Sequence, residues 1–225
     1  MLDKYYFGKV DRISPEAPVP IVNIQKEESR LGGASNVANN IVSLGGHSLL
    51  CGVIGHDLFG KEIERISRHK NIDTFLLKTS SPTITKARII GGKQQIVRVD
   101  YEDKSELNAD NKKLFRDTIS RILPEYDILV ISDYGKGLIS EDLCRYLIKL
   151  AHKYDKKVII DPKGKNWEKY SGADIVTPNV KELSDIVGYT VPNTDRAIEK
   201  AAREAITNNH LTALLVTRSD KGMSL

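Results

Sequence analysis

Residues 127–164 read DILVISDYGKGLISEDLCRYLIKLAHKYDKKVIIDPKG, in which two apolar segments of strand length flank an amphipathic segment. DILVIS (127–132) and KVIID (157–161) are the apolar segments, and residues 140–154 between them repeat leucine at helical spacing. Strands that are apolar along their whole length are covered on both faces, which is typical of parallel strands joined by helices. This stretch therefore predicts a strand–helix–strand unit of a parallel α/β sheet.

The same alternation continues on both sides of this unit. The segment NADNKKLFRDTISRIL begins at Asn108, an expected helix cap, and its expected apolar stripe consists of Leu114, Thr118, Ile119, Ile122 and Leu123. Further strands are expected at 47–55, 173–179 and 212–217, and further helices at 61–70, 180–188 and 194–209. The chain is therefore expected to be mainly a doubly wound α/β domain.

Two segments in the first half have a different pattern. Residues 17–24 and 82–102 alternate apolar and polar residues, as half-exposed antiparallel strands do, and Gly91-Gly92 is a candidate two-residue hairpin turn. Pro18 and Pro20 would be tolerated only in an edge strand. These segments predict a small antiparallel sheet inserted into the α/β domain.

Composition narrows the class of protein. The 225 residues are 40% hydrophobic and 28% charged, and no apolar run reaches the length of a membrane span or forms a secretion signal. The net charge of +4 is spread along the chain, which does not indicate nucleic-acid binding. Cys51 and Cys144 lie in apolar surroundings, and neither they nor the five histidines have metal-ligand spacing. A cytoplasmic protein is expected.

Polar residues follow four of the expected strands. They are Asp133 to Gly137, Asp161 to Gly164, Pro178-Asn179 and Thr217 to Ser219. Each group alone is a competent turn or helix cap, but the carboxyl ends of parallel strands meet at one edge of a sheet, where ligands bind. The four groups together favour a ligand site at this edge.

Asn179 and Glu182, three residues apart, have two interpretations. They could form a capping box at the start of a helix, which spacing alone favours. Glu182 could instead hold hydrated Mg²⁺ beside nucleotide phosphates, because Mg²⁺ keeps several waters and needs few protein ligands.

The segment RLGGASNVANNIVSLGG (30–46) is glycine-rich but matches neither a P-loop nor a dinucleotide-binding motif. Asn36 could bind a sugar or cap a helix, and spacing slightly favours the cap. Alternation places Lys86 and Arg88 on one face of a strand, where with Arg98 they could meet an anion or be solvated edge charges.

The motifs LGGASNVANNIVSLGG, SDYGKG, DPKG, TPNVKE and VTRSDKGMSL, in this order, resemble the ribokinase-like (PfkB-type) carbohydrate kinases. Within that family, VDRISPEAPVPIV, TITKARII and QQIVRVDYE are similar to the D-glycero-β-D-manno-heptose-7-phosphate kinases. The resemblance implies a three-layer α/β/α core with a mainly parallel sheet and a small antiparallel β lid. Residues 1–225 would form a partial kinase domain, with lid segments at about 10–28 and 82–102.

The resemblance also implies an activity and its residues. Such kinases use ATP and Mg²⁺ to phosphorylate the heptose at O1, giving heptose 1,7-bisphosphate for the lipopolysaccharide core. By matching motif, the residues expected to bind the sugar are Asp3, Gly32, Gly33, Asn36 and Asp133. Apart from the resemblance, the basic residues Lys86, Arg88 and Arg98 are our candidates for binding the 7-phosphate. Those expected near ATP are Asn179, Val180, Lys181, Glu182, Thr217, Arg218 and Gly222, with Glu182 near the metal.

The resemblance assigns the catalytic base to a Gly-Ala-Gly-Asp motif, which would follow Leu225. No residue of 1–225 is therefore expected to be the base, and we expect these residues alone to be inactive. Two alternatives are a non-catalytic remnant that binds ligands or dimerises, and a kinase for another sugar phosphate. The expected partners are a sugar phosphate and a second copy bound through the lid, with no nucleic acid or membrane. Whether an adenylyltransferase domain follows is left open.

Overall fold

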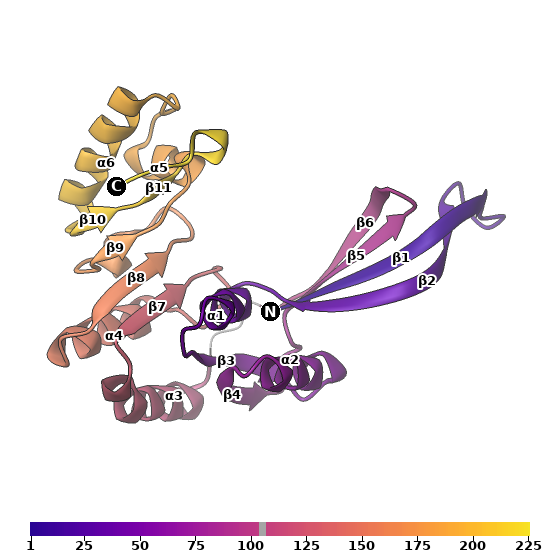
Figure 1. Ribbon diagram of the computed structural model, residues 1–225, viewed down its shortest axis with the longest axis horizontal. Coiled ribbons are helices and arrows are strands. Elements are labelled where there is room, and N and C mark those ends of the chain that lie inside the picture. Colours follow the sequence, from indigo (N-terminus) through magenta and orange to yellow (C-terminus); the bar gives the residue numbers. More distant parts are fainter. Residues whose placement is uncertain (104–106) are drawn as a thin grey trace. The chain divides into compact units, whose positions relative to one another are not determined.

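The computed structural model describes residues 1–103 and 107–225. The chain divides into two compact units, residues 1–105 and 106–225, and each is described by itself. Figure 1 labels the elements in both units. Among the described residues, no helix has the length and apolar character needed to cross a membrane.

The first unit contains a four-stranded sheet, here called the lid sheet, with the strand order β2-β1-β5-β6 (Figure 1). Its strands are β1 (Leu2–Ile13), β2 (Pro20–Leu31), β5 (Thr85–Gly91) and β6 (Gln94–Tyr101). The expectation of an entirely antiparallel sheet was wrong, because β1 and β5 pair in parallel. Both strands begin at the same buried end of the sheet, with Leu2 beside Thr85, so they run in the same direction.

Two details of the lid sheet follow from its glycine and proline residues. The hairpin turn between β5 and β6 consists of Gly92 and Lys93, one residue later than expected, and Gly92 has a positive φ of 63°. Pro20 begins β2, which is an edge strand, so its missing N–H removes no bond from the interior of the sheet.

The rest of the first unit packs two parallel strands with two helices. They are β3 (Leu49–Gly55), β4 (Asp73–Thr79), α1 (Ala34–Ser43) and α2 (Leu58–His69). Their buried cluster consists of Leu2, Leu31, Ala38, Leu50, Ile54, Ile63, Ile66 and Ile72. Because Leu2 and Leu31 come from β1 and β2, the same hydrophobic core anchors the base of the lid sheet.

The second unit has a parallel sheet with the strand order β10-β9-β8-β7 (Figure 1). Its strands are β7 (Ile128–Ser132), β8 (Lys157–Asp161), β9 (Ile175–Val176) and β10 (Ala213–Leu214), followed by a hairpin of β11 (Val216–Thr217) and β12 (Met223–Ser224). Its α-helices are α3 (Ala109–Ile122), α4 (Glu141–Lys153), α5 (Val180–Val187) and α6 (Asp195–Asn209). Short 3₁₀ turns lie at Leu123–Glu125, Glu168–Tyr170 and Ser219–Lys221. This unit confirms the predicted alternation of strands and helices.

Two expectations for this unit need correction. The strand expected at 212–217 is divided into β10 and β11 at Leu215, and β9 is only two residues long. In α3, Asn108 caps the helix as predicted, but the buried residue of its first turns is Phe115, whereas Leu114 is half exposed. The larger aromatic ring removes more apolar surface from water when it is buried than leucine does.

Asp174 forms an electrostatic anchor beside β8. Its carboxylate accepts hydrogen bonds from Lys157 Nζ at 2.8 Å and from the Val158 amide at 3.0 Å, and it lies 3.0 Å from His152 Nε2. Burial opposes ionisation of the carboxyl, but these hydrogen bonds outweigh it and lower the pKa of Asp174 to about 2.

We predict that Asp174→Asn destabilises the protein by about 2 kcal/mol at pH 7, since the carboxylate ionises more readily in the folded state than in the unfolded chain. This contribution is present above the unfolded pKa of about 4 and is lost as the pH falls through the folded value. The gap in unfolding free energy between wild type and variant, measured by urea unfolding, should therefore close between about pH 4 and pH 2. Asp185→Asn, at an exposed ion pair of 3.6 Å, is the control. A gap that does not depend on pH would contradict the assignment.

Candidate functional site

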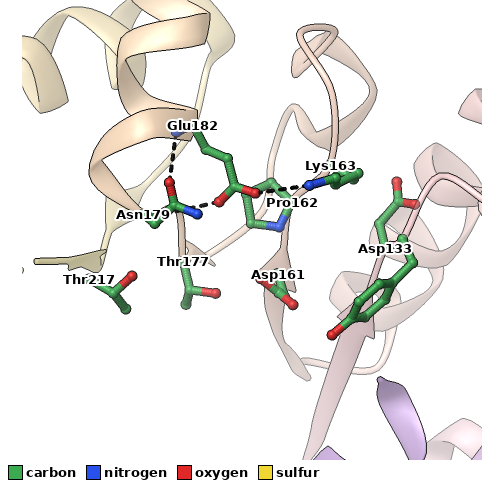
Figure 2. A pocket seen from close by; sticks show the side chains of 9 residues that line it. Asp133, Asp161, Pro162, Lys163, Thr177, Asn179, Glu182 and Thr217 are labelled. Carbon is green, nitrogen blue, oxygen red and sulfur yellow. Dashed lines mark hydrogen bonds and ion pairs between the residues drawn. The ribbon is translucent and has the colours of Figure 1, made fainter. Parts of the chain in front are cut away.

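A pocket lies at the carboxyl edge of the parallel sheet in the second unit. It has a volume of about 290 Å³ and is lined by Asp133, Tyr134, Asp161, Pro162, Lys163, Thr177, Asn179, Glu182 and Thr217. These residues lie at or just after the ends of β7, β8, β9 and β11, and Asn179 forms a bridge with Thr217. The structure thus brings together the polar groups that the sequence places after four different strands (Figure 2).

Asn179 and Glu182 form the capping box that spacing favours. The Asn179 side chain accepts from the Glu182 amide at 2.9 Å, and Glu182 Oε2 accepts from the Asn179 amide at 3.1 Å. The other carboxylate oxygen, Oε1, lies 3.5 Å from Lys163 Nζ, as Figure 2 shows. The cap thus occupies one oxygen of Glu182, and the second oxygen faces Lys163 on the pocket side.

Asp161 was not among the site residues expected from the sequence, although it ends an apolar strand. It lines the same pocket as Glu182. Burial and then the negative charge of Glu182 raise the pKa of Asp161, while Lys163 opposes the shift. Two carboxylates that repel each other in one pocket are a donor set suited to a hydrated divalent cation, which would relieve the repulsion.

Thr217, Arg218 and Gly222 come from the β11–β12 hairpin, and they differ in their exposure to the pocket. Thr217 lines it, but Arg218 is only 6% exposed. The Arg218 guanidinium donates to Asn193 Oδ1 at 2.9 Å and to Ser224 Oγ at 2.9 Å, and it pairs with Asp195 at 2.7 Å. In this structure Arg218 fastens the hairpin to the loop before α6.

The remaining residues expected near the nucleotide lie at the start of α5. Lys181 is exposed and pairs with Asp185 one turn along, and Val180 is the first residue of the helix. Neither side chain lines the pocket, so their contribution would come from the backbone N–H groups of the first turn. Gly222, at φ 74° and ψ −129°, closes the β11–β12 hairpin in a conformation that suits glycine.

Asp133 lines the pocket, but its carboxylate is already occupied by other residues of the chain. It is 3% exposed and accepts from Lys169 Nζ at 2.5 Å, from the Tyr170 hydroxyl at 2.8 Å and from the Gly135 amide at 2.7 Å. The Tyr170 oxygen in turn accepts from the Lys163 amide at 3.0 Å. Burial raises the pKa of Tyr170, so its hydroxyl stays protonated as a donor. This network therefore holds the loops after β7 and β8 together.

In the first unit, Asp3 and the Gly32-Gly33 pair are in direct contact. A Cβ atom on Gly32 would lie 2.2 Å from Asp3 Oδ2, so only glycine lets the carboxylate occupy this position. Gly33 has φ 56° and ψ −135°, a region that other residues rarely adopt. Gly33 is thus favoured by its backbone conformation, and Gly32 places its backbone beside the Asp3 carboxylate, which a larger residue would displace.

The expectation that Asn36 caps a helix was wrong. The cap of α1 is Gly33, and no side chain caps that end. Asn36 lies inside the first turn with an exposed side chain, because the helix starts directly after the turn that Gly33 makes. The role of Asn36 as a sugar ligand stays a prediction.

The three basic residues expected on the lid come from β5 and β6. Arg88 donates to Asp3 Oδ1 at 2.6 Å, and Arg98 makes two hydrogen bonds to Asp100 at 2.8 and 3.0 Å. Lys86 lies opposite Asp3 in the β1–β5 register and opposite Asp100 in the β5–β6 register. Since Asp3 joins Arg88 to Gly32, the structure connects the lid cations to the expected sugar-binding glycines.

Comparison with known proteins shows the family to which this chain belongs. Residues 5–225 match the family described as pfkB family carbohydrate kinase. The chain therefore belongs to the pfkB family of carbohydrate kinases, which confirms the resemblance found in the sequence. The α/β class is confirmed as well, with sheets that are mixed.

Relatives and solved structures make the comparison more specific. The chain is 44% identical to "D-beta-D-heptose 7-phosphate kinase" of Bordetella bronchiseptica over 100% of its own length and 70% of that protein. It is also 44% identical to "Bifunctional protein HldE" of Haemophilus influenzae, of which it spans 46%. The Escherichia coli phosphofructokinase-2 solved with fructose-6-phosphate matches with a TM-score of 0.76 at 21% identity, covering 99% of this chain and 72% of that one. The last match shows likeness of fold.

We predict that Lys169→Met lowers the free energy of unfolding by about 3 kcal/mol, because it leaves the buried Asp133 carboxylate without its cation. Lys149→Met, at an exposed position of α4, should change it by less than about 0.5 kcal/mol. Both values can be measured by urea unfolding at pH 7. Equal effects of the two substitutions would show that the Lys169–Asp133 pair does not hold these loops.

Proposed function

We propose that this chain provides the binding sites of a kinase that transfers the γ-phosphoryl group of ATP to O1 of D-glycero-β-D-manno-heptose 7-phosphate. The product would be heptose 1,7-bisphosphate, a precursor of ADP-heptose and the lipopolysaccharide core. The pfkB match and the 44% identity to a heptose 7-phosphate kinase support this assignment. The observation that carries it is the pocket in which Asp161 and Glu182 stand beside the first turn of α5.

In this proposal the nucleotide phosphates lie at the start of α5. The N–H groups of Val180 and Lys181 and the helix dipole favour anions there, and Thr217 lines the neighbouring wall. Asp161 and the Glu182 oxygen that faces Lys163 would hold hydrated Mg²⁺, which supplies charge neutralisation to the transferring phosphoryl group when bound. Arg218 and Gly222 shape the hairpin that carries Thr217.

The acceptor sugar is assigned to the first unit. Asp3, Gly32, Gly33 and Asn36 would bind its hydroxyls through one carboxylate, one amide and exposed backbone. The 7-phosphate is assigned to Lys86, Arg88 and Arg98, since guanidinium groups are permanently charged and bind phosphate with two parallel hydrogen bonds. Asp133, whose carboxylate is occupied, would act on the substrate by positioning its loop.

The Gly-Ala-Gly-Asp motif to which the resemblance assigns the catalytic base does not occur in residues 1–225. We therefore expect a polypeptide of these residues to bind ATP and the sugar phosphate without transferring phosphate at an ordinary rate. General-base catalysis contributes roughly 10²–10⁴-fold to such reactions, so a steady-state kinase assay detects the difference. Ordinary turnover by this polypeptide would show that the base lies within it. Binding of neither ligand would favour the alternative that the chain is a non-catalytic remnant. Turnover of a different sugar phosphate would show that the proposed substrate is wrong.

We predict that Glu182→Gln removes most of the gain in nucleotide affinity that Mg²⁺ provides, about tenfold or 1.4 kcal/mol. Glutamine retains the capping box, so the unfolding temperature should stay unchanged. Calorimetric titration with a non-hydrolysable ATP analogue, with Mg²⁺ and with EDTA, measures this gain. Asp185→Asn, on the same helix and outside the pocket, is the control. A Glu182→Gln protein with undiminished Mg²⁺ dependence would contradict the proposed role.

We also propose that the lid sheet joins two copies of the chain. Its register places Val10, Ile24, Val97 and Val99 on one face, and these side chains are 39–44% exposed. Lids of this family often dimerise, and burying such a face against its own copy would remove apolar surface from water. The assignment to the cytoplasm follows from the proposed substrates, ATP and a sugar phosphate.

Val97→Glu should convert a dimer into a monomer, because it places a charge in the centre of the proposed apolar contact. Lys9→Glu, an exposed position on the opposite face of the lid sheet, is the matched control. Light scattering coupled to gel filtration gives the mass of each protein. A monomeric wild type, or a dimer that survives Val97→Glu, would count against this interface.

A further inference from the structure

One face of the lid sheet, here called the charged face, collects basic side chains around a tyrosine. The register of the four strands places on this face Arg30 and Glu28 from β2, Asp3 and Tyr5 from β1, Lys86 and Arg88 from β5, and Arg98 and Asp100 from β6. Side chains at paired positions of neighbouring strands lie on the same face of a sheet. The charged face is therefore opposite to the apolar face that carries Val97.

Tyr5 lies between two guanidinium groups that come from different strands. The Cζ atom of Arg30 is 4.9 Å from the centre of the Tyr5 ring, and that of Arg88 is 5.2 Å from it. Contacts of this kind hold a flat guanidinium against the ring and leave its edge N–H groups to bind anions. In this structure Arg30 donates to Glu28 Oε2 at 2.6 Å and Arg88 donates to Asp3 Oδ1 at 2.6 Å, so a phosphate would share or replace these carboxylates. Tyr5 thus orients two cations toward the same part of the charged face.

The charged face also contains an unfavourable arrangement. Arg88 and Arg98 are directly opposite each other in the β5–β6 pair, where like charges destabilise a sheet. Each is neutralised by one carboxylate, Arg88 by Asp3 and Arg98 by Asp100. A phosphate between the two guanidinium groups would relieve the same repulsion.

The Asp3–Arg88 pair couples the two ends of the proposed acceptor site. Their side chains are 18% and 22% exposed, and the bonded atoms are 2.6 Å apart. Under the proposed function, Asp3 binds a sugar hydroxyl and Arg88 binds the phosphate. In this structure Asp3 and Arg88 form an ion pair with each other. A ligand that binds only one of these two side chains therefore has to break that ion pair.

We infer that Arg30 and Tyr5 complete the phosphate site with Arg88. The phosphate of the acceptor sugar replaces Asp3 as the partner of Arg88, and the released Asp3 carboxylate then accepts a hydrogen bond from a sugar hydroxyl. The inference rests on the proposed function and adds a reason for selectivity. An unphosphorylated sugar leaves Arg88 on Asp3 and binds weakly, whereas a sugar phosphate engages both groups together.

The test is calorimetric titration of the 225-residue chain with D-glycero-D-manno-heptose 7-phosphate and with the unphosphorylated heptose. Arg30→Gln and Tyr5→Leu should each weaken binding of the phosphorylated sugar about tenfold, and Tyr5→Phe, which keeps the ring, should retain the affinity that Tyr5→Leu loses. Arg88→Gln should weaken the phosphorylated sugar and strengthen the unphosphorylated one about threefold or more, because Asp3 is released. The matched control is Arg12→Gln, an exposed arginine near the end of β1, beyond the part of that strand that pairs with β5.

The outcomes separate the inference from the proposed function. If the wild type prefers the sugar phosphate but Arg30→Gln and Tyr5→Leu behave like Arg12→Gln, the inference is wrong and the proposed function stands. If Arg88→Gln weakens both sugars equally, the exchange between Asp3 and phosphate does not occur. If the wild type binds the nucleotide but neither sugar, the proposed acceptor is wrong and the inference fails with it. Circular dichroism of each variant confirms that it is folded.

Discussion

The proposed nucleotide site of this protein depends on one constraint, that parallel strands bring their carboxyl ends to the same edge of a sheet. This constraint gathers Asp161, Asn179 and Thr217, which are far apart in the sequence, around one pocket. The buried Asp133 carboxylate then fixes the loops, because its hydrogen bonds to Lys169 and Tyr170 can form only when the turns after β7 and β8 are side by side. The site is thus positioned by the sheet and held by a buried ion pair.

The proposed acceptor site depends on a different constraint, the absence of a side chain at Gly32. Because Gly32 has no Cβ, the Asp3 carboxylate can lie against the backbone and still reach Arg88 on the neighbouring strand. The same residues that leave room for a ligand therefore bind one another in the free chain. A site of this kind selects ligands by the bonds that they replace as well as by those that they form.

Elements with a strong periodic pattern could be predicted, and those without one could not. Local features can be predicted from the residues around them, and examples are the apolar strands β7 and β8 and the helix caps Asn108 and Asn179. By contrast, β1 has the charged sequence LDKYYFGKVDRI and was not predicted, because its partners on both sides supply the hydrogen bonds that stabilise it. The parallel pairing of β1 with β5 is equally non-local.

By itself, the sequence determined the family, the α/β class and the residue types at the strand ends, since motifs and hydrophobic periods are properties of neighbouring residues. Only the tertiary structure decided which side chains are available to a ligand. Arg218 and Asp133 match family motifs as Glu182 does, yet both are buried among partners distant in sequence, whereas Glu182 has one oxygen on the pocket side, 3.5 Å from the exposed Lys163 Nζ. Hydrogen bonds between distant residues form only when the chain has folded, and for that reason the sequence could not reveal them.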